Sequence, residues 1–179
     1  NTEQFQAMSA AIEKQLQTTL KEIKELALDI RPSVLDNFGL IPAIKALAKR
    51  LQNSTGITIN VIALTSAENL QKNIQNVLYR ITQEAINNAI KHAHSTEITI
   101  IVTNHNSYLQ LEILDNGIGF DLEQHSRFNG HSLGLMNMNE RVKAYNGAFT
   151  ITSKINKGTT VKVKFPYNNL NKDTVRTNV

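Results

Sequence analysis

Apolar residues near the start of the chain recur at spacings of three and four, which is typical of one face of an α-helix. Between positions 3 and 31 they are Phe5, Met8, Ile12, Leu16, Leu20, Ile23, Ala27 and Ile30. No Gly or Pro interrupts the pattern before Arg31-Pro32, where the residue preceding Pro is pushed out of the helical region. The pattern predicts one long helix, either a coiled-coil or bundle seam or an ordinary amphipathic helix on a core.

The rest of the chain mixes helical and strand-like patterns. A turn-rich stretch over 33–40 precedes a predicted helix over 42–53, with Pro42 at its first position. Further helices are predicted over 69–93 and 133–145, strands over 57–64, 96–103, 108–114, 148–153 and 159–165, and an aperiodic polar stretch over 121–132. We expect the strands to pair antiparallel. The fold class is therefore α+β, a two-layer α/β sandwich with an N-terminal long-helix extension.

Composition narrows the class of protein. The chain has 179 residues, enough for one full domain or for a small domain plus an appended element. Cysteine is absent, which excludes a disulfide framework, a thiolate zinc site and a cysteine nucleophile. No apolar run is long enough to span a membrane, and the first residues show no signal pattern. Because the sequence does not begin with Met, we expect it to be part of a longer protein.

The charge pattern argues against nucleic-acid binding. The net charge is +4, but the Lys and Arg residues are scattered rather than gathered in one stripe. Trp is absent and aromatic residues make up only 6%, so few side chains are available to stack on bases. The basic balance therefore indicates an ordinary solvated surface.

The predicted helix over 69–93 carries the first candidate constellation. Glu84, Asn88 and His92 are spaced at i, i+4 and i+8 and so share a face, and Lys91 lies beside them. Asn offers a neutral oxygen to a hard cation, Lys a point charge to a phosphate, and Glu a carboxylate that holds or activates water. Spacing alone favours the simpler account, a half-exposed helix with a polar outer side.

A second constellation follows the predicted strand over 108–114. There Asp115-Asn116-Gly117-Ile118-Gly119-Phe120 carries a carboxylate to the rim of the sheet. An Asp in that position can accept a hydrogen bond from an amine such as N6 of adenine. Gly117 and Gly119 permit close approach by a flat ligand. Asp-Asn-Gly is also a common turn sequence, so this motif alone does not establish a site.

Two further motifs complete the set. His131-Ser132-Leu133-Gly134-Leu135 opens a predicted helix, whose free N–H groups and dipole suit a phosphate. Gly158-Thr159-Thr160-Val161 begins the last predicted strand, where the hydroxyls either reach a ligand or serve only as strand residues. Each motif has a purely structural explanation, but their order and spacing together are much harder to explain by chance.

Taken together, the motifs give residues 69–166 a resemblance to the ATP-binding domain of sensor histidine kinases. That domain has the Bergerat fold of the GHKL superfamily, shared with gyrase, heat-shock chaperone and MutL ATPases. Residues 83–93 resemble the N box, 115–120 the first glycine box, 132–138 the second, and 158–161 the closing Gly-Thr signature. The N box and residues 28–40 are similar to the NarL/DesK-type branch. This similarity implies a partial dimerisation and phosphotransfer helix over 1–40, the catalytic domain over 41–167 and a polar tail over 168–179.

The resemblance implies a role for each motif residue. Asn88 would bind Mg²⁺, and Glu84 would act near the metal and the phosphates. Asp115 would take the adenine amino group. The residues implied to face the phosphates are Lys91, His92, His131, Gly134 and Leu135, and those implied to shape the adenine side are Gly117, Gly119, Thr159 and Thr160. Residues 121–132 would form the ATP lid.

The implied activity is transfer of the ATP γ-phosphoryl group to a His, and from there to a response regulator. The implied setting is a homodimeric bacterial sensor with its kinase part in the cytoplasm and any membrane anchor upstream. Residues 1–91 contain no His, so we expect the phosphoacceptor helix to lie upstream of this sequence. We therefore expect this chain to bind ATP without phosphorylating itself.

Three alternatives remain open. Ser132 replaces the first glycine of the second glycine box, which would suit a pseudokinase or nucleotide-binding regulatory module. An anti-sigma-type serine kinase shares the ATP fold, but it lacks a long helix such as the one predicted over 3–31. A gyrase-like or chaperone-like ATPase carries downstream transducer regions that this sequence does not contain.

Overall fold

A computed structural model describes residues 33–65, 67, 70–122 and 133–166. Its helices are α2 (Ser33–Phe38), α3 (Leu40–Thr55), α4 (Lys72–His92) and α6 (Leu133–Lys143), and its strands are β1 (Thr58–Ala63), β2 (Glu97–Asn104), β3 (Tyr108–Asp115), β4 (Ala148–Ser153) and β5 (Thr159–Pro166). The chain divides into two compact units, Asn1–Ser33 and Val34–Val179. The long helix predicted over 3–31 lies outside the described residues, as do most of the predicted lid and the polar tail. The boundaries of the three predicted domains therefore stay predictions.

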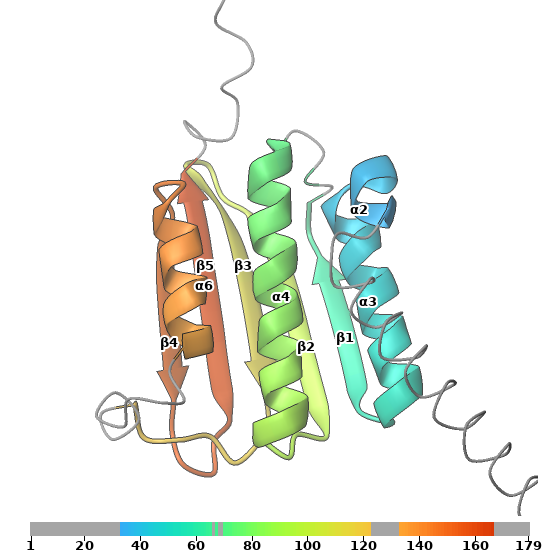
Figure 1. Ribbon diagram of the computed structural model, residues 1–179, viewed down its shortest axis with the longest axis vertical. Coiled ribbons are helices and arrows are strands. Elements are labelled where there is room, and N and C mark those ends of the chain that lie inside the picture. The colour runs from blue at the N-terminus through green and yellow to red at the C-terminus, as the bar shows by residue number, and fades with distance from the viewer. Residues whose placement is uncertain (1–32, 66, 68–69, 123–132, 167–179) are drawn as a thin grey trace, which may run out of the picture. The chain divides into compact units, whose positions relative to one another are not determined.

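The five strands form one sheet in the order β1-β2-β3-β5-β4 (Figure 1). The pairs β2–β3, β3–β5 and β4–β5 are antiparallel, as expected. The expectation was wrong for β1, which pairs parallel with β2. Parallel neighbours need a crossover connection, and α4 supplies it between these two strands.

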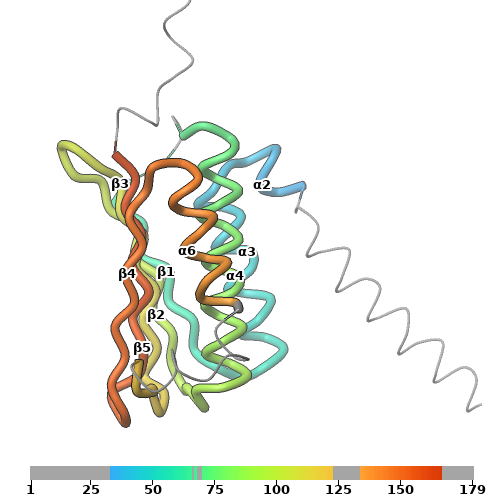
Figure 2. Tube along the Cα trace, turned by 60° about the vertical axis from the view of Figure 1, so that its left-hand side comes forward, coloured from blue at the N-terminus to red at the C-terminus, as the bar shows by residue number. Residues whose placement is uncertain are grey.

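The helices lie on one side of the sheet, which confirms the predicted two-layer α/β architecture. Figure 2 shows α3, α4 and α6 together on one side of the strands. The strands alternate accordingly, because successive side chains point to opposite faces. On β2, for example, Ile98, Ile100 and Val102 face the helices and are fully buried. Burial of these side chains and of the facing helix residues forms the single core of this unit.

Helix α4 lies over the middle of the sheet, between α3 and α6 (Figure 1). Its apolar residues are spaced by three and four and form a stripe, in which Ile74, Leu78 and Ile81 are at most 1% exposed. No helix in the described part of the chain is both long and apolar enough to cross a bilayer. Because this apolar stripe packs on the sheet, the polar side chains of α4 lie outside the hydrophobic core.

The turn-rich interpretation of residues 33–40 was wrong, because the short helix α2 occupies most of that stretch. Leu35 is buried in the core, and the backbone then breaks at Gly39, which has φ +82°. Helix α3 begins at Leu40, so Pro42 is its third residue rather than its first. Proline fits there because N–H groups in the first helical turn have no partner within the helix.

Candidate functional site

A cavity of about 580 Å³ lies between α4 and the sheet, beside the start of α6. This volume is within the usual range for small-molecule sites. Its polar lining consists of Glu84, Asn88, His92, Asp115 and Thr159, and its apolar lining includes Ala85, Ala89, Ile113, Phe120, Leu135, Ile151 and Val161. Apolar walls with a few convergent polar groups are typical of a ligand pocket.

The polar face of α4 forms one wall of this cavity. Glu84, Asn88 and His92 all line it, so the face that their spacing predicted is turned toward the cavity. Lys91 is solvent-exposed and is not among the lining residues, because it is one position away from that face of the helix. Gly134 and Leu135 of α6 also line the cavity, and Gly134 lies against the Glu84 side chain. The cavity therefore joins the N box to the second glycine box.

The end of β3 and the start of β5 form a second polar wall. Asp115 of β3 pairs across the sheet with Thr159 of β5, which in turn pairs with Ser153 of β4. The Gly117 N–H donates to Asp115 Oδ1 at 2.9 Å, and the hydroxyl of the buried Ser95 lies 3.5 Å from the same oxygen. No hydrogen bond from the described residues reaches Asp115 Oδ2. One carboxylate oxygen is therefore left for a ligand.

The loop after β3 is held by backbone and side-chain hydrogen bonds. Asn116 Oδ1 accepts from the backbone N–H groups of Thr96 and Glu97, both at 3.0 Å. Gly117 is buried against Ala93 rather than lining the cavity, whereas Gly119 does line it, with φ +58°. These contacts fix the strand end from which Asp115 projects.

Among the described residues, three predicted site residues do not line the cavity, namely Lys91, Gly117 and Thr160. Thr160 was expected on the adenine side, but it lies on the opposite face of the sheet. Because Val161 and Phe165 are buried against the helices, strand alternation places Thr159 on their side and Thr160 on the other. His131 and Ser132, the departure from the second glycine box, lie outside the described residues.

Ser153 and Ser95 are site residues that the sequence motifs did not reveal. Both lie outside the four motifs, and neither lines the cavity, but each contacts a residue that does. Ser153 hydrogen-bonds to Thr159 at 3.0 Å, and Ser95 lies beside Asp115. Sheet register identifies Ser153, since Ser153, Thr159 and Asp115 occupy one row across β4, β5 and β3.

Comparison with known proteins agrees with this geometry. Residues 73–169 match the family model described as histidine kinase-, DNA gyrase B- and HSP90-like ATPase. The oxygen sensor histidine kinase NreB of Staphylococcus carnosus (strain TM300) is 33% identical over 158 residues, which are 88% of this chain and 45% of that protein. The chain thus spans less than half the length of this relative.

Solved structures of sensor kinases share the fold. The histidine kinase domain from the Erythrobacter litoralis EL346 blue-light activated histidine kinase gives a TM-score of 0.60 at 19% identity, covering 72% of this chain and 61% of that one. The mycobacterial sensor histidine kinase MprB gives 0.52 at 19% identity, covering 69% and 91%. Because the family match spans more than half of the sequence and the predicted motifs meet at one cavity, the chain belongs to the histidine kinase-, DNA gyrase B- and HSP90-like ATPase family.

Proposed function

We propose that this chain contains the ATP-binding catalytic domain of a two-component sensor histidine kinase. In this proposal it transfers the γ-phosphoryl group of ATP to a His outside the chain, and a response regulator then receives that group. The supporting observation is that Asn88 of α4 and Asp115 of β3, assigned by resemblance to the metal and to the base, line the same cavity. The similarity to NreB supports the kinase class over the alternatives.

The chemistry of the two walls suits Mg·ATP. Asp115 offers an acceptor to the amino group of adenine, while Glu84 and Asn88 offer the hard oxygen atoms that Mg²⁺ prefers. Within the described residues, no cluster of three or more His, Asp or Glu could hold a metal by itself. That fits Mg²⁺, which usually takes one or two protein ligands and completes its shell with water and substrate phosphates. When bound, the ion would neutralise charge on the phosphates.

The residues would work mainly by positioning. Asp115 and Thr159 would orient the base, and Asn88 would hold the metal. The phosphates would then run along α4 toward the start of α6, where free N–H groups and the helix dipole favour negative charge. His92 would contact them, together with the exposed Lys91 and with His131. Phosphoryl transfer needs little from a protein beyond such placement and charge neutralisation.

The wider setting of the protein is also part of the proposal. The full protein would be a homodimer that serves one response regulator, with this part of the chain in the cytoplasm of a bacterium. Any membrane anchor would lie upstream. Residues 1–40 would contribute to the dimerisation and phosphotransfer domain, and the predicted lid over 121–132 would cover bound ATP.

Nucleotide binding by the chain tests the site. We expect Asn88→Ala to weaken Mg·ATP binding by about tenfold, equal to about 1.4 kcal/mol, because a metal ligand is lost. The same variant should bind ATP like the wild type when EDTA removes the metal. Asn73→Ala, at an exposed position near the other end of α4, is the matched control. Wild-type chain that fails to bind millimolar ATP, or an Asn88→Ala variant with unchanged affinity, would refute the assignment.

Phosphorylation of a longer chain tests the kinase class. A protein extended upstream to include the phosphoacceptor helix should acquire phosphate from ATP that is labile in acid, as phosphohistidine is. Bound ATP without any label would favour the pseudokinase alternative. Acid-stable phosphate in a target protein would favour the serine kinase.

A further inference from the structure

Ser153, at the end of β4, touches Thr159 but belongs to none of the four motifs. We propose that Ser153 is a positioning residue that fixes the direction of the Thr159 hydroxyl. This side of the cavity then presents only hydrogen-bond acceptors and selects a purine with a 6-amino group. The inference rests on the proposed function, because it takes the ligand to be a purine nucleotide.

The three polar side chains form a row at one end of the sheet. Ser153 pairs with Thr159, and Thr159 pairs with Asp115, so the row crosses β4, β5 and β3 (Figure 1). Directly paired residues have Cβ atoms about 4.5–5.5 Å apart. Asp115 and Thr159, which both line the cavity, can therefore address the same edge of one flat ligand.

Three groups hydrogen-bond to the Ser153 hydroxyl. Its Oγ accepts from the Phe120 backbone N–H at 2.9 Å. It lies 3.1 Å from the Gly158 carbonyl oxygen and 3.0 Å from Thr159 Oγ1. A hydroxyl has one proton to donate and two lone pairs to accept with. The Gly158 carbonyl can only accept, and its other donor, the Lys154 N–H, is farther away at 3.4 Å. We therefore assign the single Ser153 proton to this carbonyl.

The direction of the Thr159 proton follows from this accounting. With its own proton on the Gly158 carbonyl and one lone pair taken by Phe120, Ser153 can only accept from Thr159. The reverse arrangement would leave the Ser153–Gly158 contact without a proton. Among the described residues, Thr159 has no other side-chain hydrogen-bond partner. Its proton is therefore used inside the protein, and only lone pairs remain to face the cavity.

Asp115 reinforces this polarity. An ionised carboxylate has no proton to give, and Oδ2 has no partner among the described residues. Where both acceptors face position 6 of the base, they favour the two N–H donors of a 6-amino group and repel the oxygen of a 6-oxo group. ATP and ITP carry the same ribose and phosphates and differ at this edge of the base. The ratio of their affinities therefore reports on the groups that Asp115 and Thr159 present.

The test measures the affinity of the chain for Mg·ATP and Mg·ITP by calorimetry. We expect the wild type to bind ATP at least about tenfold more tightly than ITP, the scale of one charge-assisted hydrogen bond. Ser153→Ala removes the acceptor for the Thr159 proton, which can then turn toward a 6-oxo oxygen. The ATP-to-ITP affinity ratio should fall by about two- to tenfold, the scale of one neutral hydrogen bond.

Two control variants separate orientation from simple packing. Ser153→Thr keeps the hydroxyl and should keep the ratio. Thr152→Ala changes an exposed neighbour on β4 and should also keep it. A Ser153→Ala variant that weakens both nucleotides equally, with the ratio unchanged, would overturn the proposal by showing that Ser153 only supports the fold.

Thr159→Val tests the same polarity without altering Ser153. If Thr159 presents an acceptor, this variant weakens the binding of ATP and removes a repulsion against the 6-oxo group of ITP. The ATP-to-ITP affinity ratio then falls. A rise in the ratio would show that Thr159 donates into the cavity and would overturn the inference. Wild-type chain that binds neither nucleotide would overturn the proposed function itself, whereas equal binding of ATP and ITP would overturn only the inference.

Discussion

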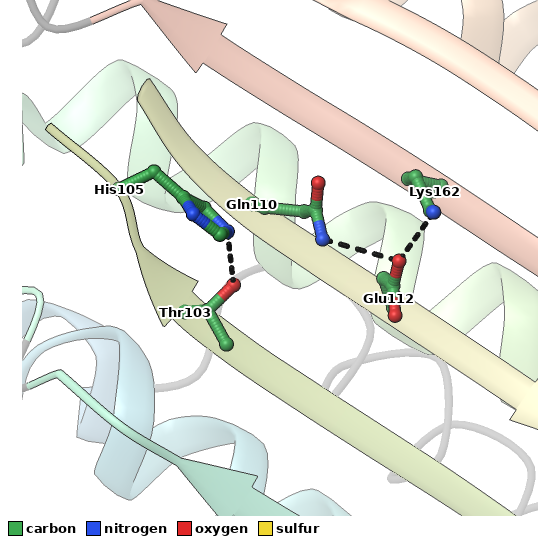
Figure 3. Close-up of polar contacts among 5 residues, drawn as sticks. All are labelled: Thr103, His105, Gln110, Glu112 and Lys162. Atoms are coloured by element: carbon green, nitrogen blue, oxygen red, sulfur yellow. Dashed lines mark hydrogen bonds and ion pairs between the residues drawn. The ribbon is translucent and has the colours of Figure 1, made fainter. Parts of the chain in front are cut away.

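Strand β3 carries an acidic side chain on each of its two faces, and the two have different surroundings. Glu112 lies on the open face, the side of the sheet that the helices do not cover. Its Oε1 is 2.6 Å from Lys162 Nζ and accepts from Gln110 Nε2 at 3.1 Å (Figure 3). Asp115 lies on the covered face at the end of the strand. Its Oδ1 accepts from its own loop, whereas Oδ2 has no partner in the described part of the chain.

Other polar side chains on the open face also have partners within the protein, as Glu112 does. The His105 ring hydrogen-bonds to Thr103 and stacks on Tyr108, with centroids 4.5 Å apart. Lys164 Nζ lies 4.7 Å from the centre of the Tyr108 ring. These polar groups satisfy one another along the strands and line no part of the cavity. The comparison shows that unused hydrogen-bonding capacity, rather than charge alone, marks the candidate site on this sheet.

The largest effect we predict comes from the turn that packs under Asp115. A Cβ added at Gly158 would overlap the carbonyl oxygen of Asp115, and the backbone there has φ +75°. Gly158→Ala should therefore destabilise the chain by about 3 kcal/mol or more, from overpacking together with left-handed strain. Urea denaturation followed by circular dichroism measures the loss.

Gly56 is a matched control for this substitution. It has the same φ of +75° at the end of α3, but an added Cβ there meets nothing within 4 Å. Gly56→Ala should cost only the conformational term, about 1–2 kcal/mol. Equal losses in the two variants would mean that the contact beneath Asp115 does not hold this strand end in place.

The next effect concerns the free oxygen of Asp115. Asp115→Asn keeps the shape of the side chain and leaves an acceptor for the Gly117 N–H, so the fold should persist. The affinity for ATP should fall by about tenfold or more, because a charge-assisted hydrogen bond is worth about 1.5–3 kcal/mol. Calorimetry with and without Mg²⁺ should show the same loss, in contrast to Asn88→Ala. A loss seen only with Mg²⁺ would place Asp115 at the metal instead of the base.

Much of the fold was predictable because its signals are local. The stripe of α4 and the alternation of β2 follow from residue spacing, and the structure confirms both. The parallel pairing of β1 with β2 was missed, because it depends on where α4 carries the chain across the sheet. The residue pattern of β1 does not indicate whether it pairs parallel or antiparallel with its neighbour.

The site was predictable residue by residue only where a motif covered it. Glu84, Asn88, Asp115 and Thr159 reach one cavity, as the resemblance implied. Thr160 was placed on the wrong face, although the alternation of the apolar residues after it already indicated the correct one. Ser153 could not be identified from its own segment, because its role arises from pairing between strands that a turn brings together.

The smallest predicted effect completes the comparison on the open face. Glu112→Gln removes one charge from β3, just as Asp115→Asn does, but its ion pair with Lys162 is partly exposed, with the Lys side chain 39% accessible. The free energy of unfolding should therefore change by less than about 1 kcal/mol, and less still at high salt. The affinity for ATP should stay within about twofold, or about 0.4 kcal/mol. A loss of affinity matching that of Asp115→Asn would show that the open face is coupled to the cavity. Hydrogen-bond pairing within the protein would then not distinguish Glu112 from a site residue.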